Sequence, residues 1–215
     1  PQLGRLWVQG AEKALPVGAS GQSVASSVAF VGSTPVVAGH YPFHTGPLGA
    51  YHEAKLWHQG ETAQFLPVTA TGSHVAQAIQ ATASDVHVAG TREGSYHKAV
   101  YWKNGEVRYL NPVDDTTYEG ASGLGVSDEG VVYISGYDFG SAQSVGFNPV
   151  VWRNGVKTKL SSSVGSATGV AVRSFDVHVS GYLRFADGTA DSAVLWKNGA
   201  LQRLGDGSSS SLARA

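Results

Sequence analysis

Short apolar segments alternate with glycine-containing turns along the whole chain, and the pattern recurs at nearly even spacing. The clearest marker is a tryptophan followed two residues later by Asn or Gln and then by Gly. Every tryptophan in the sequence belongs to one copy of this marker: Trp7, Trp57, Trp102, Trp152 and Trp196. Successive tryptophans are 50, 45, 50 and 44 residues apart, so the sequence predicts a repeat of about 47 residues.

Further patterns divide each repeat into four short strands, named A to D here in chain order. Strand A is a run of small residues, and strand B is a β-branched segment that ends in Ala or Ser followed by Gly. Strand C contains the tryptophan, and strand D ends at a leucine eight or nine residues after it. The strand B glycines are Gly39, Gly90, Gly136 and Gly181, and the strand D leucines are Leu15, Leu66, Leu110, Leu160 and Leu204.

The Asn-Gly or Gln-Gly pair between strands C and D predicts a tight β-hairpin. A type I′ turn needs positive φ at both central residues, which Asn and Gly tolerate well. No segment keeps apolar residues at helical spacing without an intervening Gly or Pro, so no helix is predicted. Four-stranded units that repeat every 40 to 50 residues or so are typical of β-propeller blades. We therefore expect an all-β fold, a five-bladed β-propeller.

Each part of the repeat has a place in such a fold. The small residues of strand A fit beside a central axis, where radial packing leaves the least room. The strand C tryptophan would fill the contact between neighbouring sheets. A stacking surface for a ligand is the alternative, but the recurrence of the same marker after every tryptophan favours packing. We therefore interpret the five tryptophans as the structural core of the repeat.

One copy, Ala99-Val100-Tyr101-Trp102-Lys103-Asn104-Gly105, resembles the VYVAG…AVYWKNG units of uncharacterised bacterial secreted and lipoprotein repeat proteins. The resemblance covers nearly the whole chain. It implies a β-propeller in an extracellular, periplasmic or cell-surface setting, and it brings no assigned activity. Repeat number and length are also similar to those of the five-bladed tachylectin-2 lectins. None of that family's sugar-binding motif is present, so this likeness concerns architecture alone.

The repeat length does not divide the 215 residues evenly. We expect a single domain over residues 1–215, with full units at about 21–70, 71–115, 116–163 and 164–207. A closing blade would be shared by residues 1–20 and 208–215, and its strand B is missing. Three outcomes stay open: a three-stranded closing blade, terminal residues lost from the chain, or a gap filled by another chain through self-association.

Composition and charge exclude several classes of partner. The formal net charge is −1 and Lys and Arg form no run, so the positive field that nucleic-acid binding requires is missing. The longest apolar runs are the size of strands, far short of the roughly 20 residues that span a bilayer. The sequence has no Met, which fits either removal of a signal peptide or a trimmed chain.

Strand order determines which loops share an end of each blade. A–B and C–D turns lie at one end, and B–C and D–A loops lie at the other. The C–D turns are uniform, whereas the B–C loops differ and contain aromatic, His and charged residues that are typical of recognition surfaces. The predicted ligand-binding residues are His40, Tyr41, Phe43, His44, Arg92, Tyr96, His97, Tyr137, Asp138, Phe139, Tyr182, Arg184, Phe185 and Asp187. The alternative is tolerated loop variation, with aromatic side chains covering the sheet edges.

Catalysis has less support in the sequence. A glycoside hydrolase in a propeller would need carboxylates on its inner strands, and the expected A strands contain none. Nucleophile-elbow, zinc-protease and P-loop motifs are all missing from the sequence. Asp85 and Asp176 precede strand B, where aspartate commonly forms turns. We therefore predict no catalytic residue.

The eight histidines raise the question of a metal site. His40 and His44 flank Pro42, and His52 and His58 follow, but no carboxylate or thiolate partner has a clear ligand spacing. We predict no metal and no cofactor, and leave open a site near His40 and His44.

These observations lead to three hypotheses. The first is a secreted or cell-envelope binding module that recognises a carbohydrate or a protein through its B–C loops. The second is a structural propeller unit that assembles with copies of itself and takes no small-molecule ligand. A glycoside hydrolase-like enzyme has the least support.

Overall fold

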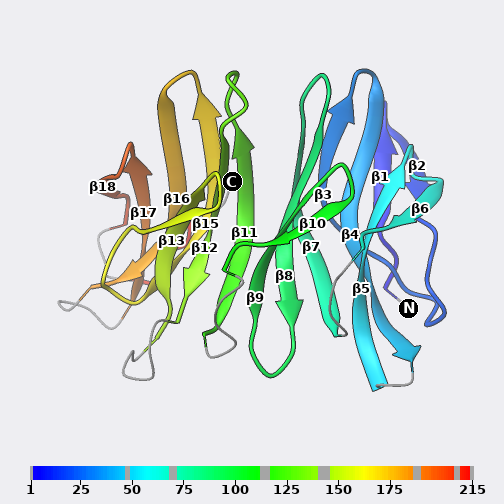
Figure 1. Ribbon diagram of the computed structural model, residues 1–215, viewed down its shortest axis with the longest axis horizontal. Coiled ribbons are helices and arrows are strands. Elements are labelled where there is room, and N and C mark those ends of the chain that lie inside the picture. The colour runs from blue at the N-terminus through cyan, green and yellow to red at the C-terminus, as the bar shows by residue number, and fades with distance from the viewer. Residues whose placement is uncertain are drawn as a thin grey trace. The chain divides into compact units, whose positions relative to one another are not determined.

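The computed structural model describes residues 2–46, 49–67, 72–111, 117–139, 146–185, 190–205 and 209–213, without the side chains of 43–46, 49, 50, 62 and 63 (Figure 1). All regular secondary structure in these residues is β-strand. The strands form four four-stranded antiparallel sheets and one two-stranded hairpin. The predicted all-β fold of four-stranded repeats is therefore confirmed.

The chain divides into two compact units. The first contains the residues up to 95 together with 100–109, and the second contains 96–99 and the residues from 110 onward. Strands of the first unit are β1 (Arg5–Val8), β2 (Ala11–Ala14), β3 (Val24–Val31), β4 (Thr34–Gly46), β5 (Gly49–His58), β6 (Thr62–Phe65), β7 (Ser73–Ala81), β8 (Val86–Glu93), β9 (Lys98–Lys103) and β10 (Glu106–Tyr109). They make the β1–β2 hairpin and the sheets β3–β6 and β7–β10, and the first two residues of β9 fall in the second unit.

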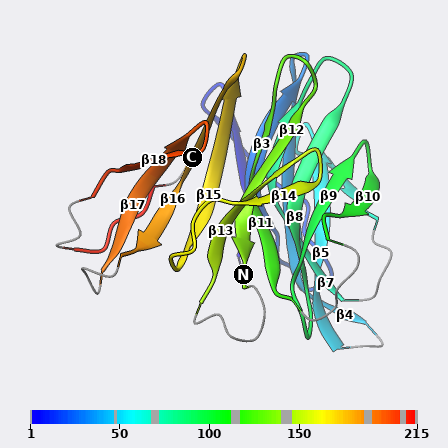
Figure 2. The same ribbon diagram turned by 60° about the vertical axis from the view of Figure 1, so that its left-hand side comes forward.

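The second unit consists of two sheets, each in the order A, B, C, D. Its strands are β11 (Glu119–Val126), β12 (Val132–Asp138), β13 (Asn148–Arg153), β14 (Val156–Lys159), β15 (Gly165–Arg173), β16 (Asp176–Arg184), β17 (Asp191–Lys197) and β18 (Ala200–Arg203). Figure 2 shows the sheet β15–β18, with the short β18 at one edge. Strand order follows chain order in both sheets, as the repeat predicts.

All five predicted C–D hairpins are present, with positive φ at both central residues of each turn. The φ angles at the first position range from 49° to 53°, and the following glycines lie between 69° and 86°. The pairs are Gln9–Gly10, Gln59–Gly60, Asn104–Gly105, Asn154–Gly155 and Asn198–Gly199. This confirms the turn predicted from two residues alone.

Where the first turn residue is asparagine, it also ties the C–D turn to strand B of its own sheet. The side-chain oxygen accepts a hydrogen bond from the backbone nitrogen of a residue at or next to the start of strand B. The donors and acceptors are Val86 and Asn104, Val132 and Asn154, and Val177 and Asn198, at 2.8 to 2.9 Å. The A–B and C–D turns therefore share one end of each of these three sheets, as predicted.

Asp85 and Asp176 complete this contact in two of the three sheets. Each accepts a hydrogen bond from the asparagine side chain of the C–D turn, at 2.7 and 3.0 Å. Each also pairs with the lysine before that asparagine, Lys103 at 3.1 Å and Lys197 at 3.2 Å. The asparagine hydrogen bonds, followed by the lysines, lower the pKa of both aspartates. Both are structural, as predicted, but they bind side chains of the opposite turn.

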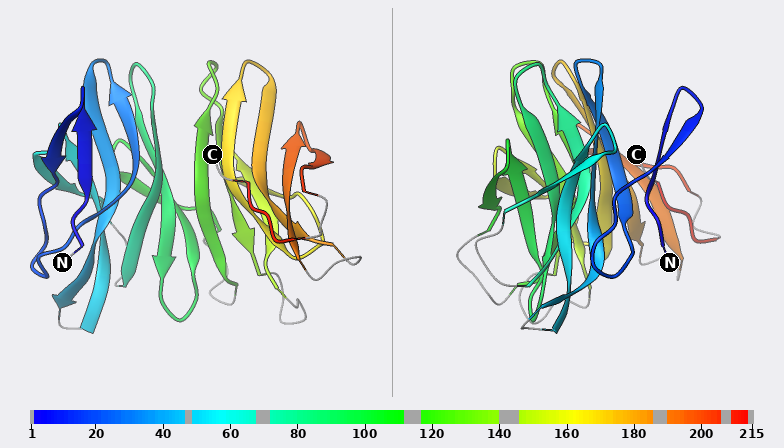
Figure 3. Two further views of the ribbon diagram at one scale, coloured as in Figure 1. Left: turned by 180° about the vertical axis from the view of Figure 1, so that it is seen from behind. Right: turned by 90° about the vertical axis from the view of Figure 1, so that its right-hand side faces the viewer.

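Four of the five tryptophans are buried in the sheets: Trp57, Trp102, Trp152 and Trp196, each at most 1% exposed. Trp102 contributes to the main core of the first unit, and Trp196 packs with Val170, Val179 and Leu183 in the second. Trp7 is different, because 62% of its surface is exposed. Its predicted core role is therefore wrong for the hairpin, which lies beside the sheet β3–β6 (Figure 3). The contact with that sheet is made by Leu6 and Leu15 instead.

A β-bulge that the sequence pattern did not predict recurs in strand A of every full sheet. The register shifts lie between Ala25 and Ser27, Ala76 and Ala78, Ala121 and Gly123, and Ala167 and Gly169. At the strand B glycine across from each bulge, an added Cβ would overlap a strand A carbonyl oxygen. In three sheets it would also lie 3.0 Å from the tryptophan ring. The repeated glycine is therefore required by close packing between strands A, B and C.

The expected closing blade is not formed by the residues that the structure describes. β1 pairs only with β2, and residues 209–213 are not in a strand. They lie against the last sheet instead, where Ser211 donates its backbone hydrogen bond to the Asp191 carbonyl at 2.7 Å. The shared blade therefore stays a prediction. None of the described residues forms a helix that could cross a membrane.

Candidate functional site

Three segments meet at the B–C end of the second unit and are joined by backbone hydrogen bonds. Glu119 at the start of β11 donates to the His97 carbonyl at 2.9 Å. Phe139, directly after β12, donates to the Tyr118 carbonyl at 2.8 Å. The loop before β9, the segment before β11 and the end of β12 are thus held together, although the sequence separates them by 20 residues or more.

The side chains of these three segments and of Phe147, directly before β13, form an aromatic cluster, defined as Tyr96, His97, Tyr118, Tyr137, Phe139 and Phe147. Tyr118 contacts Tyr96 and His97, with ring centroids 5.4 Å apart in both cases, and Phe139 at 6.2 Å. Phe147 contacts Tyr137 at 4.7 Å and Phe139 at 5.4 Å. The rings meet at 58° to 74°, in the tilted and edge-to-face geometries that aromatic pairs favour.

Tyr137 occupies the inner side of the cluster because strand A leaves space for it. A Cβ at Gly120 would overlap the Tyr137 ring, so glycine is needed at that position. The Tyr137 hydroxyl lies 3.4 Å from Nδ1 of His97. Tyr96 and Phe147 are the most exposed members, at 39% and 40%. The cluster is thus fixed from within and presents two rings to solvent.

Two buried carboxylates and a partly exposed lysine lie next to the cluster on the same sheet. Lys157 of β14 places its Nζ 2.5 Å from Oε1 of Glu119 and 2.7 Å from Oδ2 of Asp138. Glu119 is 0% exposed, and its Oε1 also accepts a hydrogen bond from Asn111 at 3.2 Å. Burial disfavours the charged lysine, but its hydrogen bonds to Asp138 and Glu119 outweigh that and raise the pKa of Lys157.

The position of Glu119 corrects one sequence expectation. The A strands were expected to contain no carboxylate, but β11 starts at Glu119 rather than at the small residues that follow it. A lysine lies between this carboxylate and Asp138, so the three groups form an ion-pair network in which the two carboxylates are buried and the lysine reaches solvent. Such a network links strands β11, β12 and β14, and it presents neither carboxylate as an open general acid.

Five predicted ligand-binding residues are brought together here: Tyr96, His97, Tyr137, Asp138 and Phe139. The prediction missed Tyr118, Phe147, Glu119 and Lys157. Tyr118 precedes strand A and therefore lies in a D–A loop, which the strand order had already placed at this end. Searching both loop types for aromatic residues would have found it. Lys157 gave no signal, because its side chain crosses from the far edge of the sheet.

Three other predicted residues with described side chains lie in the first unit, and two of them are near other histidines. His40 has its ring 5.0 Å from that of His52, and burial followed by the charge of His52 lowers the pKa of His40 to about 4. Tyr41 is only 8% exposed and belongs to the core around Trp57. Arg92 lies near His74, whose pKa is lowered to about 4 chiefly by burial.

The remaining predicted residues belong to the last sheet or lie outside the described set. Arg184 pairs with Asp191 at 3.0 Å, and the Arg203 guanidinium lies 4.4 Å over the Phe185 ring. Tyr182 is half-buried in β16. The side chains of Phe43 and His44, and Asp187 altogether, lie outside the described residues.

No metal site is found among the described side chains, where no three or more His, Asp or Glu residues are arranged to bind an ion. The nearest approach is His52, whose Nδ1 lies 3.0 Å from Oε2 of Glu93 beside His40. His44, the other histidine proposed for such a site, has no described side chain.

Comparisons with known proteins inform the fold alone. No protein-family model matches the sequence, and no curated protein matches it either. The uncomplexed acylaminoacyl peptidase of Pyrococcus horikoshii is similar in structure, with a TM-score of 0.51 and 16% identity over 92% of this chain. This chain corresponds to 28% of the peptidase's length. A GH43 endo-arabinanase from Bacillus licheniformis has a TM-score of 0.41 and 10% identity, over 80% of this chain and 70% of its own.

Proposed function

We propose that this protein is a five-bladed β-propeller that acts as a binding module and recognises a carbohydrate or a protein through its B–C loops. The observation that supports this function is the aromatic cluster. Six rings from four chain segments converge at one end of one unit, and the two most exposed rings lie at its margin. Rigid aromatic side chains supply contact area at low entropic cost, which is why they dominate binding sites.

The chemistry of the cluster favours a ligand with both apolar and hydroxyl surfaces, so a carbohydrate is the first candidate. Tyr96 and Phe147 offer exposed ring faces, while the hydroxyl of Tyr137 and the imidazole of His97 offer hydrogen-bonding atoms. The Glu119–Lys157–Asp138 network fixes the strands beneath these rings. A ligand would therefore meet a surface that is already ordered, which lowers the entropic cost of binding.

The direct test is a glycan array with the full chain, combined with affinity capture of proteins from a bacterial envelope fraction. Replacing Tyr96 and Phe147 together by Ala should weaken binding of any detected ligand at least about tenfold. Phe175→Ser is the matched control, because it removes an exposed ring from the opposite, turn-bearing end of a sheet in the same unit. Unchanged affinity in the double variant would contradict the proposal.

Self-assembly is a second candidate function, and one specific observation favours it. Trp7 of the hairpin and Phe30 of β3 are 62% and 61% exposed, although the repeat predicts a buried position for Trp7. Exposed apolar side chains mark a contact surface where they form a continuous patch, and this candidate function requires that these two do. Light scattering over a wide concentration range tests self-assembly, because a monomer at every concentration rules it out. If an oligomer is found, the double variant Trp7→Ser and Phe30→Ser should abolish it.

The proposal includes an extracellular, periplasmic or cell-surface location, for which the resemblance of the repeats to secreted and lipoprotein units is the support. Fractionation of cells that express the complete gene would test it. Recovery in the cytoplasmic fraction alone would contradict this part of the proposal and leave the binding function to be judged separately.

A further inference from the structure

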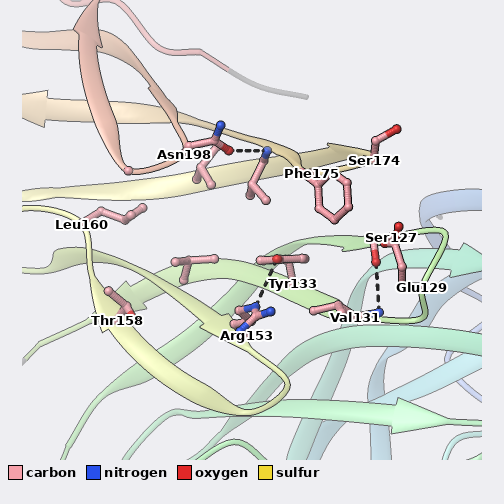
Figure 4. Close-up of a pocket in the computed structure, with 14 residues that line it drawn as sticks. Ser127, Glu129, Val131, Tyr133, Arg153, Thr158, Leu160, Ser174, Phe175 and Asn198 are labelled. Carbon is pink, nitrogen blue, oxygen red and sulfur yellow. Dashed lines mark hydrogen bonds between the residues drawn. The ribbon is translucent and has the colours of Figure 1, made fainter.

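A groove with a volume of about 700 Å³ lies between the two sheets of the second unit, at their turn-bearing end (Figure 4). Its apolar lining includes Val131 and Tyr133 from one sheet and Phe175, Val177 and Val179 from the other. The volume falls within the range of roughly 300 to 1,000 Å³ that is typical of small-molecule sites. None of the residues predicted to bind a ligand lines this groove, so it is distinct from the aromatic cluster.

The groove also contains a cation that lacks the partner it has elsewhere in the repeat. Lys103 and Lys197 follow their tryptophans and pair with Asp85 and Asp176 of the A–B turns. Arg153 follows Trp152 in the same way, but the position of the aspartate is occupied by Val131. Among the described residues no carboxylate forms an ion pair with Arg153.

The contacts of Arg153 place its charge in the groove. Its Nε donates a hydrogen bond to the Tyr133 hydroxyl at 3.2 Å, and both side chains line the cavity. Glu129 lines the groove as well, beside Ser127 at the A–B turn (Figure 4). It forms no ion pair with Arg153. Arg153 is solvent-exposed at the edge of this apolar lining, and its planar guanidinium can pair with a carboxylate through two parallel hydrogen bonds.

Phe175 departs from the repeat at the same place. The equivalent residue of the A–B turn in the second full repeat is Ser84, whereas Phe175 is 86% exposed at the edge of the groove. The residue before it, Ser174, has a φ of 52°, which turns the chain tightly at this point. Two substitutions at A–B turns, Val for Asp and Phe for Ser, therefore give one groove both a free cation and an added apolar wall.

We propose that this groove binds a small organic acid with an apolar body and a single carboxylate. The carboxylate would pair with the guanidinium of Arg153, in the role that Asp85 and Asp176 have toward their lysines. The apolar body would lie between Val131 and Val177 and beneath Phe175. A groove of this volume holds a small molecule, so the occupant is a free acid rather than a protein partner.

The test is a calorimetric titration of the full chain with octanoate, below the concentration at which it forms micelles. Val131→Asp restores the aspartate that the other repeats have, so its turn should fold normally while Arg153 becomes neutralised. We expect Val131→Asp and Arg153→Gln each to weaken octanoate binding at least about tenfold. Lys197→Gln is the matched control, since it removes an equal charge outside the groove, and its affinity should stay within about twofold of the parent chain.

Three comparisons can overturn the proposal. Octanol that binds as tightly as octanoate would show that Arg153 is not used. A tripeptide with a C-terminal phenylalanine that binds when octanoate does not would make the occupant a peptide end instead. Undetectable octanoate binding to the parent chain would refute the site altogether. If circular dichroism showed that Val131→Asp does not fold, the octanoate affinity of Arg153→Gln alone would test the proposal. Glycan binding that is unchanged in either variant would show that the groove and the B–C end are independent sites.

Discussion

The β1–β2 hairpin and the four full sheets share the same sequence marker but use it differently. Both form the predicted turn, with positive φ at Gln9 and Gly10 as at Asn198 and Gly199. Trp196 is nevertheless buried and Trp7 is mostly exposed. The turn depends on two adjacent residues, whereas burial of the tryptophan depends on strands A and B and on a neighbouring sheet. The marker therefore specifies a local shape, and the rest of the repeat turns that shape into a core.

The largest difference in stability between the sheets and the hairpin should appear when Trp196 and Trp7 are each replaced by alanine. Trp196→Ala should destabilise the protein by about 3–5 kcal/mol, because it empties the centre of a packed core. Trp7→Ala should cost less than about 0.5 kcal/mol, as expected for an exposed side chain. Urea unfolding followed by circular dichroism measures both. Equal losses would mean that the hairpin tryptophan is covered in solution.

Substitution of the strand B glycine should cause the next largest loss of stability, and only in the full sheets, since the hairpin has no such glycine. Gly181→Ala places a methyl group against the Ser166 carbonyl and the Trp196 ring, and it should cost up to about 3 kcal/mol. Gly181→Ser should cost more than Gly181→Ala, because overlap increases with side-chain size. Thermal unfolding measures the difference, and a neutral Gly181→Ala would show that the bulge relaxes freely.

The asparagine contact should have a smaller effect. Asn198→Ala removes the acceptor for the Val177 nitrogen and the donor to Asp176, and it should cost about 1–2 kcal/mol together with the strain of alanine at positive φ. Gln9→Ala has the same backbone strain at a φ of 50°, and no described residue bonds the Gln9 side chain. The difference in unfolding free energy between these variants measures the contact itself. No difference would mean that the turn alone carries the effect.

A dependence of stability on pH should also separate the two regions, because the sheets contain buried histidines and the hairpin has none. Burial lowers the pKa of His40 and His74 from 6.5 to about 4. Between these values the unfolded chain binds protons that the folded chain does not, so stability is complete above about pH 6.5 and falls as the pH decreases toward 4. Melting temperatures between pH 7 and 5 should decline, and His74→Gln should reduce the slope. A slope that is unchanged in this variant would assign the effect elsewhere.

Much of the fold could be predicted from the sequence because its signals are local. Gly105 and Asn104 specify a turn on their own, and the spacing of the tryptophans gives the four-stranded unit. The bulge next to Gly136 could not be predicted, because it arises from the pairing of two strands whose small residues allow several registers. The exposure of Trp7 depends on which strands surround it, and this information is not contained in its flanking residues.

The candidate site was predicted in part for the same reason. Loop composition identified Tyr96, His97 and Phe139, and strand order placed them at one end. It did not identify Glu119, because the boundary between loop and strand A was set two residues too late. Lys157 lies in strand D, far along the chain from the B–C loops, and only the fold brings it to Asp138.

The bulge, the strand B glycine and the tryptophan have a consequence for how the repeats of such a protein can evolve. All three contacts lie inside one sheet, so a copied repeat carries the complete set of instructions for its own shape. Duplication or loss of one whole repeat would leave the internal geometry of every other repeat intact. Lineages of this protein should therefore differ by whole units of about 47 residues, while single insertions should be confined to the B–C and D–A loops.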